Sequence, residues 1–184
     1  MKEISLNILD ITMNSVKAGA KNIGITIDET DTVLDITITD DGKGMSEQML
    51  ANVTDPFCTS RTTRKVGLGV PFYKLAAEMT GGEFSIKSKQ KKSEGDLSGT
   101  SVRAVFNKSH IDCMPLGDII STICVLVQGS PQIDFEFHHR INGKEINLST
   151  AVMRELLGEE ISLASPEIIA FIRQSLSEEY DEIK

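Results

Sequence analysis

Two short runs of alternating residues constrain the fold of this chain more than any other feature. Isoleucines alternate with small or polar residues over 23–28, and residues 34–39 repeat the pattern after a polar turn. This period of two predicts a pair of half-buried antiparallel strands. The same alternation places Asp40 on the apolar face of the second strand, so a carboxylate points into the core where that strand ends.

Glycines follow this inward carboxylate directly, in the order Asp40-Asp41-Gly42-Lys43-Gly44. An unpartnered buried carboxylate costs several kcal/mol, and the amino group of a ligand is one partner that would relieve this cost. Residues without a Cβ would let the backbone approach a flat ring closely. An ordinary turn is the alternative, because Asp-Gly is common turn chemistry.

An N-terminal helix is expected over residues 5–20, with a polar strip between apolar ones. At about 100° per residue, one apolar stripe lies beside the strip; it consists of Leu6, Leu9, Met13 and Val16. The strip contains Asp10, Asn14 and Lys17, and Ile11 and Ala18 flank its far side. Such a strip predicts side chains that face a cleft within the protein, although a solvated helix face is the alternative.

The three residue types of the strip suit the chemistry of a bound triphosphate. Asn14 offers an uncharged oxygen for Mg²⁺, which takes few protein ligands and keeps several waters. Lys17 is a point charge within reach of phosphates. Asp10 is placed to orient or deprotonate a water molecule or a substrate hydroxyl.

A second glycine motif, Gly67-Leu68-Gly69, opens another predicted helix. Free N–H groups and the helix dipole favour an anion at such an N-terminus, although a simple loop-to-helix turn is the alternative. The preceding segment, 53–66, is polar and without period, and it is long enough for a functional lid. Its basic residues are Arg61, Arg64 and Lys65.

The pattern changes near residue 108, which divides the chain into a domain over 1–108 and an extension over 109–184. The extension is expected to contain a helix over 115–128, a hairpin at Asn142-Gly143 and helices after the hairpin. The sequence leaves three roles open for it: a dimerisation element, a module that docks a protein partner, or a cap that extends the sheet.

Composition narrows the function classes. The 184 residues carry a net charge of −8, which argues against non-specific binding to nucleic acid or anionic lipid. No apolar run reaches membrane-spanning length, and the N-terminus lacks the features of a signal peptide. The three cysteines, Cys58, Cys113 and Cys124, form no CxxC pair and are interpreted as reduced thiols of a cytoplasmic protein.

Over about residues 4–106 the chain resembles the GHKL superfamily, the ATP-binding (Bergerat) fold of sensor histidine kinases, the ATPase domains of DNA gyrase, Hsp-type chaperones and MutL proteins. Residues 10–20 resemble its N box, 40–44 its G1 box and 67–69 its G2 box, while Gly99-Thr100 resembles the pair that closes the site. Residues 55–61 are similar to the lid of histidine kinases. The resemblance implies an α+β two-layer sandwich, with a mixed, mostly antiparallel sheet and helices on one face.

The resemblance also implies a site for ATP or ADP with Mg²⁺. Asp40 would bind the adenine amino group, Asn14 would bind the metal, Lys17 would contact phosphate, and the lid over 53–66 would order over the nucleotide. The implied nucleotide-binding residues are Asn14, Lys17, Asp40, Gly42, Gly44, Met45, Arg64, Lys65, Gly67, Leu68, Gly69 and Thr100.

Two departures from the superfamily pattern affect the expected activity. The ATPase branches carry Glu as the general base of the N box, whereas this chain has the shorter Asp10. The kinase branch places a phospho-acceptor histidine before the ATP domain, whereas His110, His138 and His139 all follow it. The chain is therefore not expected to be a complete sensor kinase.

Three functions remain from the sequence. The favoured one is a slow ATPase that acts as a nucleotide-dependent switch, with Asp10 as the catalytic residue. The second is a kinase that phosphorylates a separate protein, as the anti-sigma-factor kinases of the superfamily do. The third is an adaptor that binds nucleotide without turnover.

Overall fold

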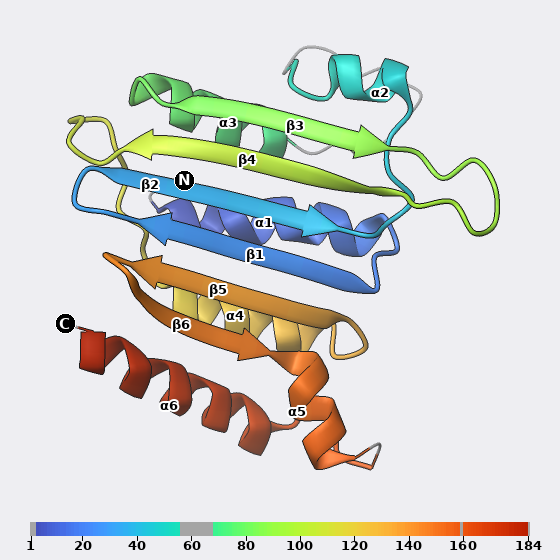
Figure 1. Ribbon diagram of the computed structural model, residues 1–184, viewed down its shortest axis with the longest axis vertical. Helices are drawn as coiled ribbons and strands as arrows, with labels where there is room; N and C mark the ends of the chain where they lie inside the picture. Colours follow the sequence, from blue (N-terminus) through green and yellow to red (C-terminus); the bar gives the residue numbers. More distant parts are fainter. Residues whose placement is uncertain (1–2, 56–67, 159, 184) are drawn as a thin grey trace.

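A computed structural model describes residues 3–55, 68–158 and 160–183, and it shows a six-stranded sheet with the strand order β3-β4-β2-β1-β5-β6 (Figure 1). The helices and strands of these residues are α1 (Ile4–Lys17), β1 (Asn22–Glu29), β2 (Val33–Asp40), α2 (Glu47–Asn52), α3 (Gly69–Met79), β3 (Glu83–Lys89), β4 (Gly99–Asn107), α4 (Ile119–Gly129), β5 (Asp134–Ile141), β6 (Lys144–Ser149), α5 (Thr150–Leu157) and α6 (Pro166–Ile183).

The sheet is mixed and mostly antiparallel, as the family resemblance implies. β1 pairs antiparallel with β2, β2 with β4, β3 with β4, and β5 with β6, whereas β1 and β5 run parallel. The β5–β6 turn has positive φ at both Asn142 (48°) and Gly143 (89°). These are the dihedral signs that a two-residue type I′ hairpin requires, which explains the Asn-Gly pair.

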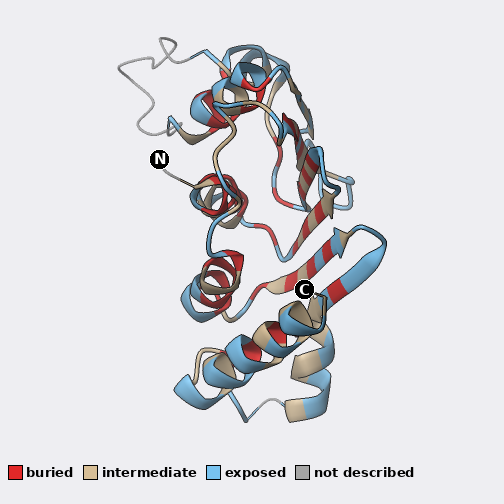
Figure 2. Cartoon of the chain, turned by 90° about the vertical axis from the view of Figure 1, so that its left-hand side faces the viewer, coloured by how far each residue is buried: buried red, intermediate tan, exposed pale blue. Residues whose placement is uncertain are grey.

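The molecule has two layers, because α1, α3 and α4 all lie on one face of the sheet (Figures 1 and 2). Strand residues that face these helices are buried, for example Ile25, Ile36 and Ala104. The residues between them, such as Thr37 and Arg103, are more exposed, and Figure 2 shows this alternation along the strands. The predicted two-layer α+β sandwich is confirmed.

Helix α1 buries a different face from the one that periodicity suggests. Ile4, Ile8 and Ile11 are its buried apolar residues, whereas Leu6 is 41% exposed. The predicted stripe of Leu6, Leu9, Met13 and Val16 packs only in part. Both stripes are apolar, so periodicity cannot rank them. The sheet below α1 and its neighbours α3 and α4 decide which one is covered. The helix ends at Lys17 rather than near residue 20, before Gly19 with a φ of 75°.

Residues beyond 108 continue the same sheet, because β5 lies beside β1 and α4 packs beside α1. The predicted helix over 115–128 begins only at Ile119, where Asp118 accepts a hydrogen bond from Ser121 N at 2.8 Å. Residues 115 and 116 instead precede the helix, and their carbonyl groups accept from the free N–H groups of Ile4 and Ser5. Among the described residues, none of the helices combines the length and the apolar character needed to cross a membrane.

A hydrogen-bonded network ties α6 to the sheet. His139 on β5 is 1% exposed; its Nε2 lies 3.0 Å from Oε2 of Glu29 on β1. Its Nδ1 lies 2.6 Å from the hydroxyl of Tyr180 on α6. Lys108, just after β4, donates to Oε1 of Glu29 at 2.7 Å. The hydrogen bonds from His139 and Lys108, against the effect of burial, lower the pKa of Glu29 to about 2.

The depressed pKa makes a prediction about stability in acid. A folded-state pKa of about 2 against an ordinary 4.5 means that ionised Glu29 stabilises the fold above pH 4.5, and that this contribution is lost as the pH falls towards 2. We expect Glu29→Gln to lower the free energy of unfolding in urea by up to about 3 kcal/mol at neutral pH, and by clearly less near pH 3.

Asp31→Asn is the control for this prediction. Asp31 accepts from the Asn142 side chain at 3.0 Å on the exposed surface, and we expect its substitution to change stability little. A loss from Glu29→Gln that is equal at both pH values would contradict the assignment.

Candidate nucleotide-binding site

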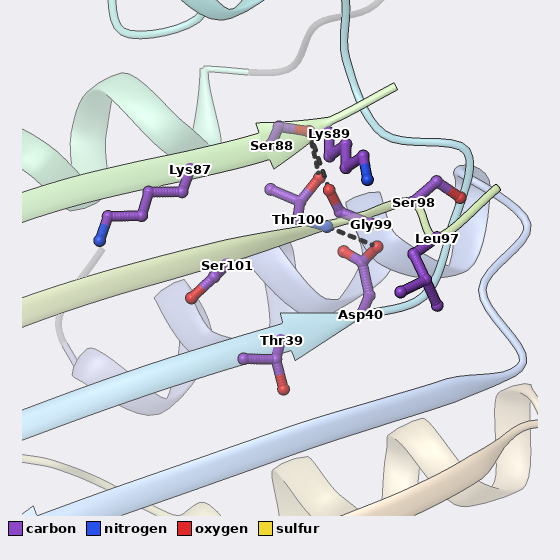
Figure 3. A pocket seen from close by; sticks show the side chains of 10 residues that line it. All are labelled: Thr39, Asp40, Lys87, Ser88, Lys89, Leu97, Ser98, Gly99, Thr100 and Ser101. Carbon is purple, nitrogen blue, oxygen red and sulfur yellow. Dashed lines mark hydrogen bonds between the residues drawn. The ribbon is translucent and has the colours of Figure 1, made fainter. Parts of the chain in front are cut away.

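The centre of the candidate site is Asp40, whose side chain points toward the helical layer as strand alternation predicts. Its Oδ2 accepts a hydrogen bond from the Ser15 hydroxyl on α1 at 2.6 Å. Its Oδ1 accepts from the backbone N–H groups of Gly42 at 2.9 Å and Thr100 at 3.2 Å. A helix, a loop and a neighbouring strand thus hold one carboxylate, and Figure 3 shows its contact with Thr100.

Ser15 is a part of the site that sequence reasoning missed. It is 5% exposed and lies one turn after Ile11, on the face of α1 that covers the sheet. A small polar residue on that otherwise apolar face was the available signal. Because hydrogen bonds to a charged group are stronger than neutral ones, this contact fixes the Asp40 carboxylate firmly against α1.

The loop after β2 is held against the β3–β4 hairpin. Met45 N donates to the Ser88 hydroxyl at 2.8 Å, and the Ser98 hydroxyl donates to the Gly42 carbonyl at 2.8 Å. Gly44 has a φ of 66°, and a Cβ there would overlap the carbonyl of Lys89. A glycine is therefore required at position 44 both for its dihedral angle and for this close approach.

Thr100 lies directly opposite Asp40 in the β2–β4 register. Its hydroxyl is 2.9 Å from that of Ser88, which also donates to the Gly99 carbonyl at 3.1 Å (Figure 3). Ser88 is a second residue that the motif analysis overlooked. The predicted pair Gly99-Thr100 does lie beside Asp40, so the structure brings these two motifs together.

The polar strip of α1 lies next to the start of α3. Asn14 is half-buried, whereas Asp10 and Lys17 are exposed. A Cβ built on Gly69 would lie 3.3 Å from the Cβ of Asp10, so the first residue of α3 contacts this strip. The free N–H groups of the first turn of α3 therefore lie on the same side as the Asp10 carboxylate.

Part of the predicted site lies outside the described residues. This applies to Arg64, Lys65 and Gly67, to most of the lid over 53–66, and to Cys58. Leu68 is described as the N-cap residue of α3 and is 48% exposed.

The donor set around Asn14 fits a magnesium ion that is shared with phosphates. No hydrogen bond engages the Asn14 amide in the described part of the chain, so its oxygen is available. Across the described ranges, no group of three or more His, Cys, Asp or Glu residues could form a metal cage by itself. One amide oxygen near a carboxylate suits Mg²⁺, which takes its remaining ligands from phosphates and water.

Comparison with known proteins points to one family. The model of the family described as "Histidine kinase-, DNA gyrase B-, and HSP90-like ATPase" matches residues 2–110. No curated protein matches the sequence significantly.

Two solved structures share the fold at low identity. The N-terminal domain of a DNA repair protein has a TM-score of 0.54 at 14% identity, covering 81% of this chain and 53% of its own length. The Aquifex aeolicus MutL ATPase domain complexed with ADP has a TM-score of 0.55 at 12% identity, covering 85% of this chain and 68% of its own. This chain thus spans about half of the first structure and two thirds of the second.

The contact between Ser15 and Asp40 yields a prediction. Ser15→Ala removes a donor from a partly buried carboxylate, and we expect the free energy of unfolding to fall by about 1–3 kcal/mol. Ser5→Ala is the matched control, because Ser5 is also buried on α1 but its hydroxyl bonds Glu3 at 3.3 Å, away from the site. Urea denaturation measures both variants, and equal losses would contradict a special role for the Asp40 contact.

Proposed function

Because the chain belongs to the family of histidine kinase-, DNA gyrase B- and HSP90-like ATPases, we propose that it is a slow Mg-ATP hydrolase that acts as a nucleotide-dependent switch. The observation that carries the proposal is the Asp40 carboxylate, which faces the helical layer at the end of β2 and is held by donors from three segments.

In this proposal, Asp40 recognises the base of the nucleotide. A fixed carboxylate accepts a hydrogen bond from the exocyclic amino group of adenine, which guanine lacks at that position. The backbone of Gly42 and Gly44 admits a flat ring because no Cβ projects from it. Met45 follows Gly44 in the chain, and its N–H donates to the Ser88 hydroxyl, which also contacts the Thr100 hydroxyl. In this proposal, Met45 and Thr100 pack around the base.

The phosphates extend from the base toward α3. The N–H groups at Leu68 and Gly69 favour an anion there, and Lys17 adds a positive charge one turn beyond Asn14 on α1. Asn14 would bind Mg²⁺, which neutralises charge on the phosphate oxygens. The resemblance assigns further phosphate contacts to Arg64, Lys65 and Gly67, which lie outside the described residues. In the Aquifex MutL ATPase domain, the same fold is complexed with ADP, which supports the assignment.

Asp10 is the proposed general base. Its exposed carboxylate lies beside Gly69, at the helix N-terminus where the terminal phosphate would sit. There it accepts a proton from a water molecule as the water oxygen attacks the γ-phosphorus and ADP departs with the electrons of the broken P–O bond. Because Asp is a methylene shorter than Glu, the water must lie closer to α1, and slow turnover is expected.

Phosphate transfer to a separate protein is the second candidate function. Two of the three histidines do not favour self-phosphorylation, since His139 is buried between Glu29 and Tyr180 and His138 is hydrogen-bonded to Asn147 at 2.6 Å. In this second candidate function, a separate protein supplies the acceptor. A nucleotide-binding adaptor without turnover is the third candidate.

Residues 109–184 are proposed to dock a protein partner or a second copy of the chain. This extension holds 13 acidic and 5 basic residues, whereas residues 1–108 hold 14 of each, so it carries the whole net charge. Val152, Leu156 and Phe171 are exposed on its helices. The two described cysteines, Cys113 and Cys124, are free, which supports a reducing, cytoplasmic location.

Base recognition is tested by Asp40→Asn. We expect affinity for an ATP analogue, measured by calorimetry, to fall at least about tenfold. The asparagine amide replaces one carboxylate oxygen by an NH₂ donor and removes the negative charge, so it accepts a hydrogen bond from the adenine amino group less well. Asp41→Asn is the matched control: Asp41 bonds the backbone of Lys21 and Asn22 instead. Retained affinity in Asp40→Asn would refute the adenine assignment.

Turnover is tested by ADP formation from Mg-ATP, with Asp10→Asn compared with the unmodified chain. We expect the variant to bind ATP but to lose hydrolysis by about 100-fold, since removal of a general base costs that order of rate. Equal hydrolysis by both proteins would exclude Asp10 as the base. Absence of hydrolysis together with phosphate transfer to a co-purified protein would favour the kinase.

A further inference from the structure

The sheet carries a pocket on the face that has no helices. It has a volume of about 420 Å³ and lies at the ends of β2, β3 and β4 (Figure 3). The pocket shares Asp40, Ser88 and Thr100 with the nucleotide site, whereas Thr39, Lys87 and Ser101 line this pocket alone.

Strand alternation separates this pocket from the nucleotide site. Ile38 and Val102 face the helices and are buried, so their neighbours Thr39 and Ser101 face the opposite side. The carboxylate of Asp40 is bonded to α1, whereas the row of Thr39 and Ser101 lies on the open face. The two sites therefore lie back to back and meet at the strand ends, where Asp40, Ser88 and Thr100 border both.

Three donors form a straight row across the pocket floor. Lys87 lies directly opposite Ser101 in the β3–β4 register, and Ser101 lies directly opposite Thr39 in the β2–β4 register. Opposed side chains in antiparallel strands have Cβ atoms about 4.5–5.5 Å apart, so one ammonium group and two hydroxyl groups come within reach of a single ligand group. In the residues that the structure covers, no hydrogen bond or ion pair engages these three side chains.

The end of the row remains open toward β1. Gly24 lies opposite Thr39 in the β1–β2 register, and a Cβ there would lie 2.7 Å from the Thr39 hydroxyl oxygen. The absence of a side chain at position 24 thus keeps the Thr39 hydroxyl uncovered.

Positive charge predominates around the pocket, in contrast to the acidic chain as a whole. The Asp40 carboxylate, which also lines the pocket, accepts hydrogen bonds from Ser15, Gly42 and Thr100. Residues 85–98 contain four lysines and two acidic residues, and Lys43 adjoins them through the bond from Lys91 N to its carbonyl at 2.8 Å. Of the two acids, Asp96 accepts from the backbone N–H groups of Lys92 and Ser93 and is turned into its own loop. This end of the sheet therefore attracts anions, while residues 109–184 repel them.

We propose that this pocket binds a phosphoryl group, carried either by a small phosphate compound or by a phosphorylated side chain of a partner protein. Ammonium and hydroxyl groups are the donors that phosphate oxygens accept from, and the pocket is large enough for one such group with its neighbouring atoms. The proposal does not depend on ATP binding, because its donors lie on the opposite face of the sheet.

The test is an NMR titration of the full chain with pyrophosphate and, separately, with a phosphoserine peptide, at constant ionic strength. We expect saturable shifts of the amide signals of Thr39, Lys87 and Ser101. Thr39→Val, Ser101→Ala and Lys87→Gln should each weaken binding by about fivefold or more, because each removes one donor. Lys91→Gln is the matched control, since it removes a lysine charge from the loop after β3 and Lys91 does not line the pocket; its effect should stay below about twofold.

The outcomes distinguish the two sources of the phosphoryl group and the site itself. A peptide that binds much more tightly than pyrophosphate identifies a partner protein, and equal or tighter binding of pyrophosphate identifies a small compound; both support the site. Two results would overturn the proposal: amide shifts that do not saturate, or equal losses of affinity in Lys87→Gln and Lys91→Gln. Either result would mean that the anion is attracted by the overall positive charge and not bound in the pocket. One-for-one displacement of pyrophosphate by an ATP analogue would also overturn it, by placing the anion in the nucleotide site.

Discussion

The carboxylate of Asp40 is the constraint on which the candidate site depends. A charge that leaves water needs donors close by, and these come from Ser15 on α1, from Gly42 in the following loop and from Thr100 on β4. Satisfying them requires α1 to lie over the end of β2 and β4 to lie beside it. The hydrogen bonds that satisfy the carboxylate also hold α1 in place, with its polar strip next to the start of α3.

The extension beyond residue 108 is continuous with this arrangement. β5 pairs with β1, and the network of Glu29, His139 and Tyr180 holds α6 against the same sheet, with Lys108 at the junction. The acidic part of the chain is thereby fixed at one end of the sheet, and the lysine-rich β3–β4 hairpin lies at the other (Figure 1). This separation of charge gives the molecule two surfaces that suit ligands of opposite sign.

Features that depend only on near neighbours in the chain were predicted correctly. The alternating runs became β1 and β2, and Asn142-Gly143 forms the expected hairpin. The inward orientation of Asp40 followed from strand parity alone. Each of these follows from a pattern of adjacent residues, either the period of two in a strand or the dihedral preferences of a turn, which can be recognised in the sequence alone.

By itself the sequence thus determined the strands, the turns, the inward carboxylate and the order of the motifs. Only the tertiary structure decided which apolar face of α1 is buried, that Ser15 and Ser88 support the site, and that Gly69 lies beside Asp10. It also decided that β5 joins β1 and extends the sheet. These outcomes depend on contacts between residues far apart in the chain. Where two faces have similar polarity, as on α1, the shape of the neighbouring elements determines which face is buried.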